Sequence, residues 1–270
     1  MRVQKTRVVQ FLFLLFALSF FNSCIKSETA HEILQTAINS IDTIETIYFK
    51  QEMARTNPQN ANDTILRFRE MYFARCLSDS IVGVKGHWYM YLDDKINVIY
   101  EDIYDGNRLV RKNNRDSVAR VYDLIKYPGF KNQHFWGHNT LYGMQYEFRY
   151  ILEHLDNYSL ERLNDTLLLD KLSFQLFVKL EEKTSMPGFA TRLEDSEGSI
   201  SEILYVIEKE TYYPIRMKVV SYFSDSPEQK TFIDQTYYDI EFNLKIDDSV
   251  YFCTSVKSLK GYKMVEMKPS

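Results

Sequence analysis

The residue patterns that mark common enzyme sites are absent from this sequence. It contains no Gly-x-Ser-x-Gly nucleophile turn, no His-Glu-x-x-His zinc motif and no glycine-rich phosphate or dinucleotide loop. His134 and His138 have the spacing of two metal ligands on one helix face, but the Phe-Trp-Gly between them disfavours a regular helix. Adjacent acids such as Asp93-Asp94 would point to opposite faces of a strand, not at one substrate. We therefore expect a protein that is not an enzyme and holds no metal and no cofactor.

The amino terminus has the three-part organisation of an export signal. Three basic residues and no acid precede an apolar run from Phe11 to Phe21, which ends at Asn22-Ser23-Cys24. As a helix this run would rise only about 16 Å, roughly half the thickness of a bilayer core. The segment is therefore predicted to be a signal peptide and not a membrane span.

This signal resembles those of bacterial lipoproteins, in which a cysteine thiol receives a diacylglyceryl group and becomes the first mature residue. The resemblance implies removal of residues 1–23, lipidation of Cys24 and a lipidated tether over residues 24–30. Phe21 and Asn22 depart from the usual motif, so an ordinary secretory signal with an incidental Cys24 stays open. Lipidation would anchor the protein to the bacterial cell envelope without a membrane helix, and the outer membrane is the expected location.

Two further features bear on modification. Once Cys24 is committed to lipid, Cys76 and Cys253 remain, and in the envelope they could form a disulfide or stay as two separate thiols. Asp followed by Ser or Thr and an apolar residue recurs far more often than the roughly one triplet expected by chance. These triplets resemble an O-glycosylation sequon of some envelope bacteria, and the threonines concerned are Thr43, Thr64 and Thr166. The alternative is that Asp-Ser/Thr simply suits turns that lead into strands.

Composition and charge narrow the class of protein. Of 270 residues, 45% are hydrophobic and 15% aromatic, which is typical of a folded, strand-rich chain. The formal net charge of -4 argues against a nucleic-acid partner, since phosphate backbones require a basic surface.

The periodicity of apolar residues predicts the elements that would position any site. Spacing near 3.6 residues predicts helices over His31–Ile41, Val118–Ile125 and Thr140–Asp156, and alternation predicts about ten antiparallel strands, the last at Tyr251–Thr254. No linker divides them, so residues 31–270 are predicted to form a single α+β domain. So many strands in one sheet would curl into a half-barrel, with the N-terminal helix and a helical insert covering its open face.

Aromatic and apolar side chains that share the predicted inner side of these strands form the candidate ligand site. The candidates are Phe49, Met53, Trp88, Met90, Phe174 and Leu176. They would either pack as an ordinary core or line a cavity for an acyl chain, because a half-barrel builds both from the same face.

The order of the elements, together with three short motifs, resembles a known family. The motifs are Tyr104-Asp105-Gly106, Tyr212-Tyr213-Pro214-Ile215-Arg216 and Tyr237-Tyr238-Asp239-Ile240-Glu241-Phe242-Asn243. They are similar to those of the LolA/LppX-like half-barrel envelope lipoproteins, and of the amino-terminal modules that precede thioredoxin-like domains. The resemblance implies a carrier that binds a lipid or another apolar ligand, or a protein-interaction module with a packed core and an envelope partner. No Cys-x-x-Cys is present, so redox activity is not implied.

Overall fold

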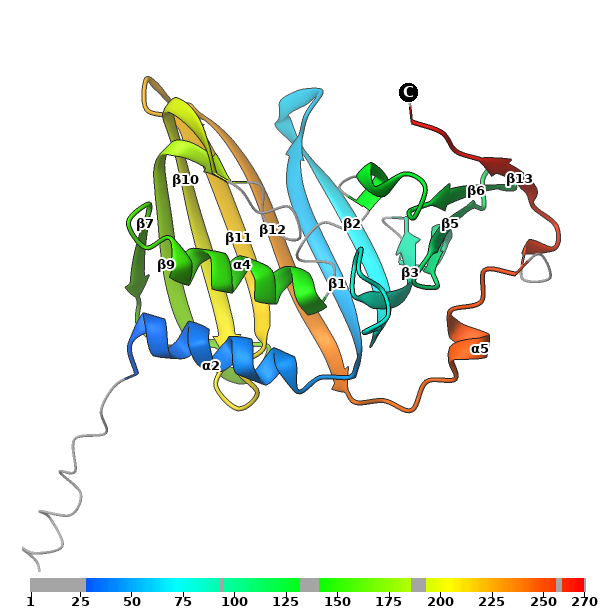
Figure 1. Ribbon diagram of the computed structural model, residues 1–270. Coiled ribbons are helices and arrows are strands. Elements are labelled where there is room, and N and C mark those ends of the chain that lie inside the picture. The colour runs from blue at the N-terminus through cyan, green and yellow to red at the C-terminus, as the bar shows by residue number, and fades with distance from the viewer. Residues whose placement is uncertain (1–27, 93–94, 132–140, 186–192, 256–258, 270) are drawn as a thin grey trace, which may run out of the picture.

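One large curled sheet wraps around two helices in the computed structural model of Figure 1. The structure describes residues 28–92, 95–131, 141–185, 193–255 and 259–269. The sheet has 13 strands, and its described neighbours pair antiparallel except for β13, which runs parallel to β6. The predicted α+β fold with a curled, unclosed antiparallel sheet is confirmed.

The sheet is built from two meanders that meet in its middle. The first half contains β1 (Thr46–Asn57), β2 (Asn60–Arg75), β3 (Val84–Tyr91), β4 (Val98–Tyr104), β5 (Arg108–Asn113) and β6 (Val118–Asp123). The second contains β7 (Tyr158–Arg162), β8 (Thr166–Leu168), β9 (Lys171–Ser185), β10 (Leu193–Glu208), β11 (Pro214–Phe223) and β12 (Ser226–Phe242). β1 pairs with β12, so the strand order is β13-β6-β5-β4-β3-β2-β1-β12-β11-β10-β9-β7, with β8 paired to β9.

Helix α2 (Ala30–Asp42) is defined at both ends by side chains. Thr29 and Glu32 form a capping box at its start, which satisfies backbone N–H groups that have no partner within the helix. At its end, Arg75 of β2 donates to the carbonyl oxygens of Ile41 and Asp42, both at 3.0 Å. A cation at a helix C-terminus also complements the helix dipole, so this contact fixes α2 against the sheet.

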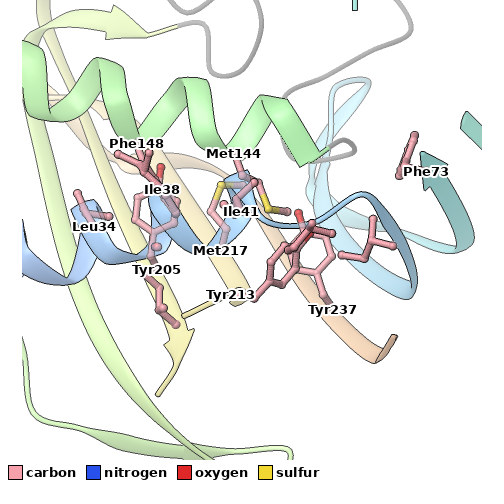
Figure 2. Packing of buried hydrophobic residues seen from close by; sticks show 14 of the residues in the cluster. Leu34, Ile38, Ile41, Phe73, Met144, Phe148, Tyr205, Tyr213, Met217 and Tyr237 are labelled. Carbon is pink, nitrogen blue, oxygen red and sulfur yellow. The ribbon is translucent and has the colours of Figure 1, made fainter. Parts of the chain in front are cut away.

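Helix α4 (Leu141–Glu153) lies beside α2 on the same face of the sheet, which we call the inner face (Figure 1). The two helices cover β9 to β12, and their apolar sides meet buried side chains of those strands (Figure 2). We call this part of the molecule the helix-covered region. It includes Leu34, Ile38, Met144, Phe148, Tyr205 and Met217. The predicted N-terminal helix and helical insert over the open face are therefore present.

Two predicted elements are wrong. Val118–Ile125 was predicted as a helix, but β6 occupies Val118–Asp123. The local apolar pattern fits both a helix and a strand, and backbone hydrogen bonds to β5 on one side and β13 on the other favour the strand. Tyr251–Thr254 was predicted as a strand, but Tyr251 ends a one-turn helix, α5 (Asp248–Tyr251), which Asp247 caps, and the next three residues form no strand. The last strand is β13 (Lys263–Glu266).

The chain after β12 crosses the opposite, outer face of the first half. Val110, Ala119 and Val121 form a small second core there with Leu259. This segment adds β13 to the edge strand β6, so the C-terminal part of the chain covers an edge that would otherwise be open.

Candidate functional site

The six candidate ligand residues all occupy inner-face positions but do not converge on one space. Phe49 and Trp88 belong to an aromatic row on β1 to β3, in which Phe73 stands 6.0 Å from Phe49 and 5.9 Å from Trp88 between ring centroids. Phe174 and Leu176 lie on β9, and five strands separate them from β3 in the sheet order.

Burial further divides these candidates. Phe49, Trp88, Phe174 and Leu176 are buried in the main core. Met53 is also buried, and Met90 is half-buried. Most of the candidates therefore pack as core, and only Met90 is partly exposed.

A pocket lies on the inner face at the end of the sheet away from α2. It has a volume of about 310 Å³ and is lined by the ends of β1, β2, β11 and β12. Its walls are mainly apolar. Val219 of β11 lies opposite Ile233 of β12, and Ile233 lies opposite Arg55 of β1. Directly opposite residues of antiparallel strands share a face, so these three side chains stand in one row. The volume matches ligand pockets, which range over roughly 300–1,000 Å³.

Arginine residues continue from this pocket along the inner face of the first half. Cross-strand pairing fixes their positions: Arg69 pairs with Gln51, and Arg111 pairs with Arg120 and with Asp102. We call this set the arginine belt; its members are Arg55, Arg67, Arg69, Arg111 and Arg120. The sequence analysis did not identify it, although two arginines at alternate positions of β2 (Arg67 and Arg69) were a visible signal.

Carboxylates pair with two members of the belt, Arg111 and Arg120. Arg111 donates from Nε and Nη2 to both oxygens of Asp102, each at 2.7 Å, and Asp102 is fully buried. Arg120 pairs with Asp116 at 3.4 Å. Arg69 donates to the neutral Oε1 of Gln51 at 3.0 Å.

The electrostatics of Arg69 reflect this arrangement. Burial lowers the pKa of Arg69 to about 10, and the positive charges of Arg111 and Arg55 lower it further, against the opposing influence of Asp102. Arg69 therefore stays protonated at neutral pH.

The outer face carries a different cluster, which the sequence analysis also missed. The carboxylate of Glu70 accepts hydrogen bonds from the hydroxyls of Tyr48 (3.2 Å), Tyr72 (3.1 Å) and Tyr91 (2.9 Å). Burial and the charge of Glu70 raise the pKa of each of these tyrosines. A pocket of about 280 Å³ opens beside Tyr91 and Glu70. We call this set of three tyrosines and Glu70 the tyrosine cluster.

Cys76 is buried and Cys253 is half-buried, and both lie near the turn that contains Asp105 and Gly106. Cys76 Sγ is 3.4 Å from Ser78 Oγ, and a Cβ added to Gly106 would lie 3.5 Å from that sulfur. Thr254, which follows Cys253, donates to the side chain of the adjacent Asp105. The Cys76–Cys253 disulfide stays a prediction, and Cys24 lies outside the described residues.

The candidate glycosylation sites differ in access. Thr43 and Thr64 are exposed, and Thr166 is half-buried. Within the described ranges, no three His, Cys, Asp or Glu side chains gather into a group able to hold a metal ion. No described helix combines the length and apolar character needed to cross a membrane.

Comparisons with known proteins give structural similarity only. No protein-family model matches the chain, and no curated protein matches its sequence. The lipoprotein LppX of Mycobacterium tuberculosis aligns with a TM-score of 0.46 and 6% identity over 81% of this chain and 98% of its own. A LolA superfamily protein of Nitrosomonas europaea aligns with a TM-score of 0.36 and 10% identity over 83% of this chain and 98% of its own. A chain of the Pseudomonas aeruginosa MucA/MucB complex gives 0.43 and 9% over 86% of this chain and 60% of that one. LppX and the LolA superfamily are the proteins named by the sequence resemblance.

Proposed function

We propose that this protein is a non-enzymatic lipoprotein of the bacterial cell envelope that holds a lipid or another apolar ligand on the inner face of its half-barrel. The observation that carries the proposal is the pocket of about 310 Å³ between the ends of β1, β2, β11 and β12. Its mainly apolar walls would release ordered water on binding an acyl chain, which is the main driving force for such ligands.

The ligand position differs from the one that the six candidate residues suggested. Phe174 and Leu176 are taken up by packing beneath the helices, so they support the site from a distance. Met53 and Met90 lie on the inner face next to arginines of the belt, through the pairs Met53–Arg67 and Arg69–Met90. Flexible methionine side chains suit a surface that must adapt to an apolar ligand.

The test is native mass spectrometry of the full-length chain as the cell processes it, kept in solution with a nonionic amphipol. We expect an additional mass that organic extraction releases as a lipid. Val219→Trp should fill the pocket and abolish this mass, whereas Val220→Trp places the same side chain on the outer face and should retain it. A wild-type protein without any bound mass would refute the proposal.

The anchor is proposed to be the acylated Cys24, and the membrane the outer one. Growth with an alkyne-labelled fatty acid should label the wild-type protein and leave Cys24→Ser unlabelled. Equal labelling of Cys24→Ser would contradict lipidation at this residue, and fractionation of the envelope would report which membrane holds the protein.

A second candidate function is a protein-interaction module, and the tyrosine cluster favours it. Tyrosine is enriched at protein interfaces because its ring buries apolar area while its hydroxyl keeps a hydrogen bond. A photo-crosslinking residue at Tyr91 should then capture a defined envelope protein, and one at the exposed Leu167 on the far strand β8 should not. Capture at both positions, or at neither, would argue against this function.

A further inference from the structure

One atom of the Arg55 side chain is buried at the edge of an apolar pocket. The side chain lines the pocket, and its Nε has no hydrogen-bond partner among the described residues. A buried polar atom without a hydrogen bond costs free energy, so natural proteins normally pair it. The Nε of Arg55 therefore calls for an acceptor that the described chain does not supply.

Asp102 is a buried carboxylate beside the belt, and Arg111 already donates hydrogen bonds to it. Both oxygens of Asp102 accept hydrogen bonds from Arg111. In the strand order, this pair lies on one side of Arg69 and the pocket lies on the other. The charges of Arg55 and Arg111 both act on Arg69, whose position on β2 lies between them. Arg55 is thus the member of the belt that lines the pocket, while Asp102 is bound to Arg111.

Apolar and cationic groups meet within a single cross-strand row. The row runs from Val219 on β11 through Ile233 on β12 to Arg55 on β1. An acyl chain that lies on Val219 and Ile233 therefore brings its end to the guanidinium of Arg55. We infer that the ligand is a single-chain amphiphile with an anionic head group, a carboxylate or a phosphate, which Arg55 binds at the end of the apolar row. This inference rests on the proposed function and specifies its ligand class.

The size of the pocket and the nature of arginine both favour this class. A pocket near the lower end of the roughly 300–1,000 Å³ range suits one chain better than a lipid with several. A guanidinium offers two parallel N–H donors, which match the two oxygens of a carboxylate or phosphate.

The experiment compares ligands that share a chain and differ in charge. The full-length protein in nonionic amphipol is titrated with dodecanoate, dodecyl phosphate, the neutral dodecanol and inorganic phosphate, and binding is measured by calorimetry. We expect both anionic amphiphiles to bind roughly 10- to 100-fold more tightly than dodecanol, the range of a charge-assisted hydrogen-bonded pair. Inorganic phosphate should bind far more weakly than dodecyl phosphate.

Three variants assign the effect to Arg55. Arg55→Gln should abolish the preference for dodecanoate over dodecanol, so that the two bind with equal affinity. Arg55→Lys keeps the charge and should retain part of the preference. Arg115→Gln removes the same charge from an exposed turn and should change nothing. Thermal unfolding of each variant verifies that it is folded.

The outcomes separate this inference from the proposed function. Equal binding of dodecanoate and dodecanol would overturn the anionic head group and leave an apolar carrier intact. Inorganic phosphate that binds as tightly as dodecyl phosphate would overturn the amphiphile, since the chain would then contribute nothing. Failure of all four probes to bind would refute the proposed function itself. A preference for anions that survives in Arg55→Gln would overturn the role of Arg55.

Discussion

The helix-covered region and the arginine belt lie on the same face of one sheet, yet their side chains differ in both charge and burial. Beneath α2 and α4, large apolar residues such as Phe148 and Ile41 are almost completely buried (Figure 2). Along β1 to β6, the same face carries Arg55, Arg69 and the Asp102–Arg111 pair. Apolar burial stabilises a fold directly, whereas buried charge usually costs as much as it returns. The difference agrees with a stabilising role for the helix-covered region and with the proposed binding role of the belt.

The helix-covered region should show the largest loss of stability on truncation. Phe148 is 1% exposed and packs edge-on against Tyr205, with ring centroids 5.1 Å apart. Phe148→Ala should lower the free energy of unfolding by about 4 kcal/mol, because it removes buried area and leaves a cavity. Urea unfolding measures this. Tyr146→Ala, at a 51% exposed position of the same helix, should cost less than about 1 kcal/mol. Similar losses for both would mean that α4 does not pack on the sheet as described.

A buried ion pair makes the arginine belt sensitive in a different way. Arg111→Ala leaves the fully buried carboxylate of Asp102 without its two hydrogen bonds and should cost about 3 kcal/mol. The control is Arg216→Ala on the outer face, where the same two-bond contact with Asp234 is partly exposed and should be worth less than about 1 kcal/mol. Equal costs in urea unfolding would argue that Asp102 is accessible to water.

One titratable group in the helix-covered region should make stability depend on pH. Burial raises the pKa of Glu147 to about 8, despite a 2.7 Å hydrogen bond from Tyr205 that acts in the opposite direction. The folded state therefore holds a proton that the unfolded state, with a pKa of 4.5, releases. The stabilisation is complete below pH 4.5 and is lost as the pH rises towards 8.

Glu147→Gln should remove this dependence. Between pH 5 and pH 7, the wild-type protein should lose about 2 kcal/mol more stability than the variant, as measured by urea unfolding at each pH. Glu153→Gln, exposed on the same helix, should follow the wild-type protein. Parallel pH profiles for wild type and Glu147→Gln would show that the carboxyl is already ionised in the folded state.

These two regions also differ in how far the sequence predicts them. Residues of the helix-covered region repeat with the period of a helix or a strand, so Ile38, Phe148 and Leu176 could be assigned to a core from the sequence. The sequence does not show which core positions a neighbouring element fills, because this depends on the tertiary packing. Phe174 packs in the core for this reason and does not line a cavity.

The arginine belt could not be predicted as a site because its members come from four strands and converge only through pairing register. Arg55 and Arg111 are 56 positions apart in the chain, and each alone resembles an ordinary surface cation. The same limit explains the error at Val118–Ile125, where an eight-residue apolar pattern fits both periods and the pairing of β6 with β5 determines the strand.

The smallest expected effect concerns a buried polar atom in the helix-covered region. Tyr213 is 1% exposed and packs edge-on against Phe242, and its hydroxyl has no hydrogen-bond partner among the described residues. Tyr213→Phe should leave stability within about 0.5 kcal/mol of wild type or raise it, because no bond is lost and a desolvation cost is removed. Tyr205→Phe, equally buried, loses its bond to Glu147 and should cost about 1–2 kcal/mol in the same urea measurements.

The Tyr213 hydroxyl and the Arg55 Nε both lack a hydrogen-bond partner among the described residues, and the comparison between them separates structure from binding. Removal of the hydroxyl should change neither stability nor ligand affinity, since it faces packed rings. Removal of the guanidinium should change affinity for anionic amphiphiles and leave stability nearly unaltered, since Arg55 is half-buried at a pocket. If Tyr213→Phe instead lowered the free energy of unfolding by more than about 1 kcal/mol, the lack of a hydrogen-bond partner would no longer distinguish a ligand-binding group from a structural one in this fold. The assignment of Arg55 would then depend on its ligand measurements alone.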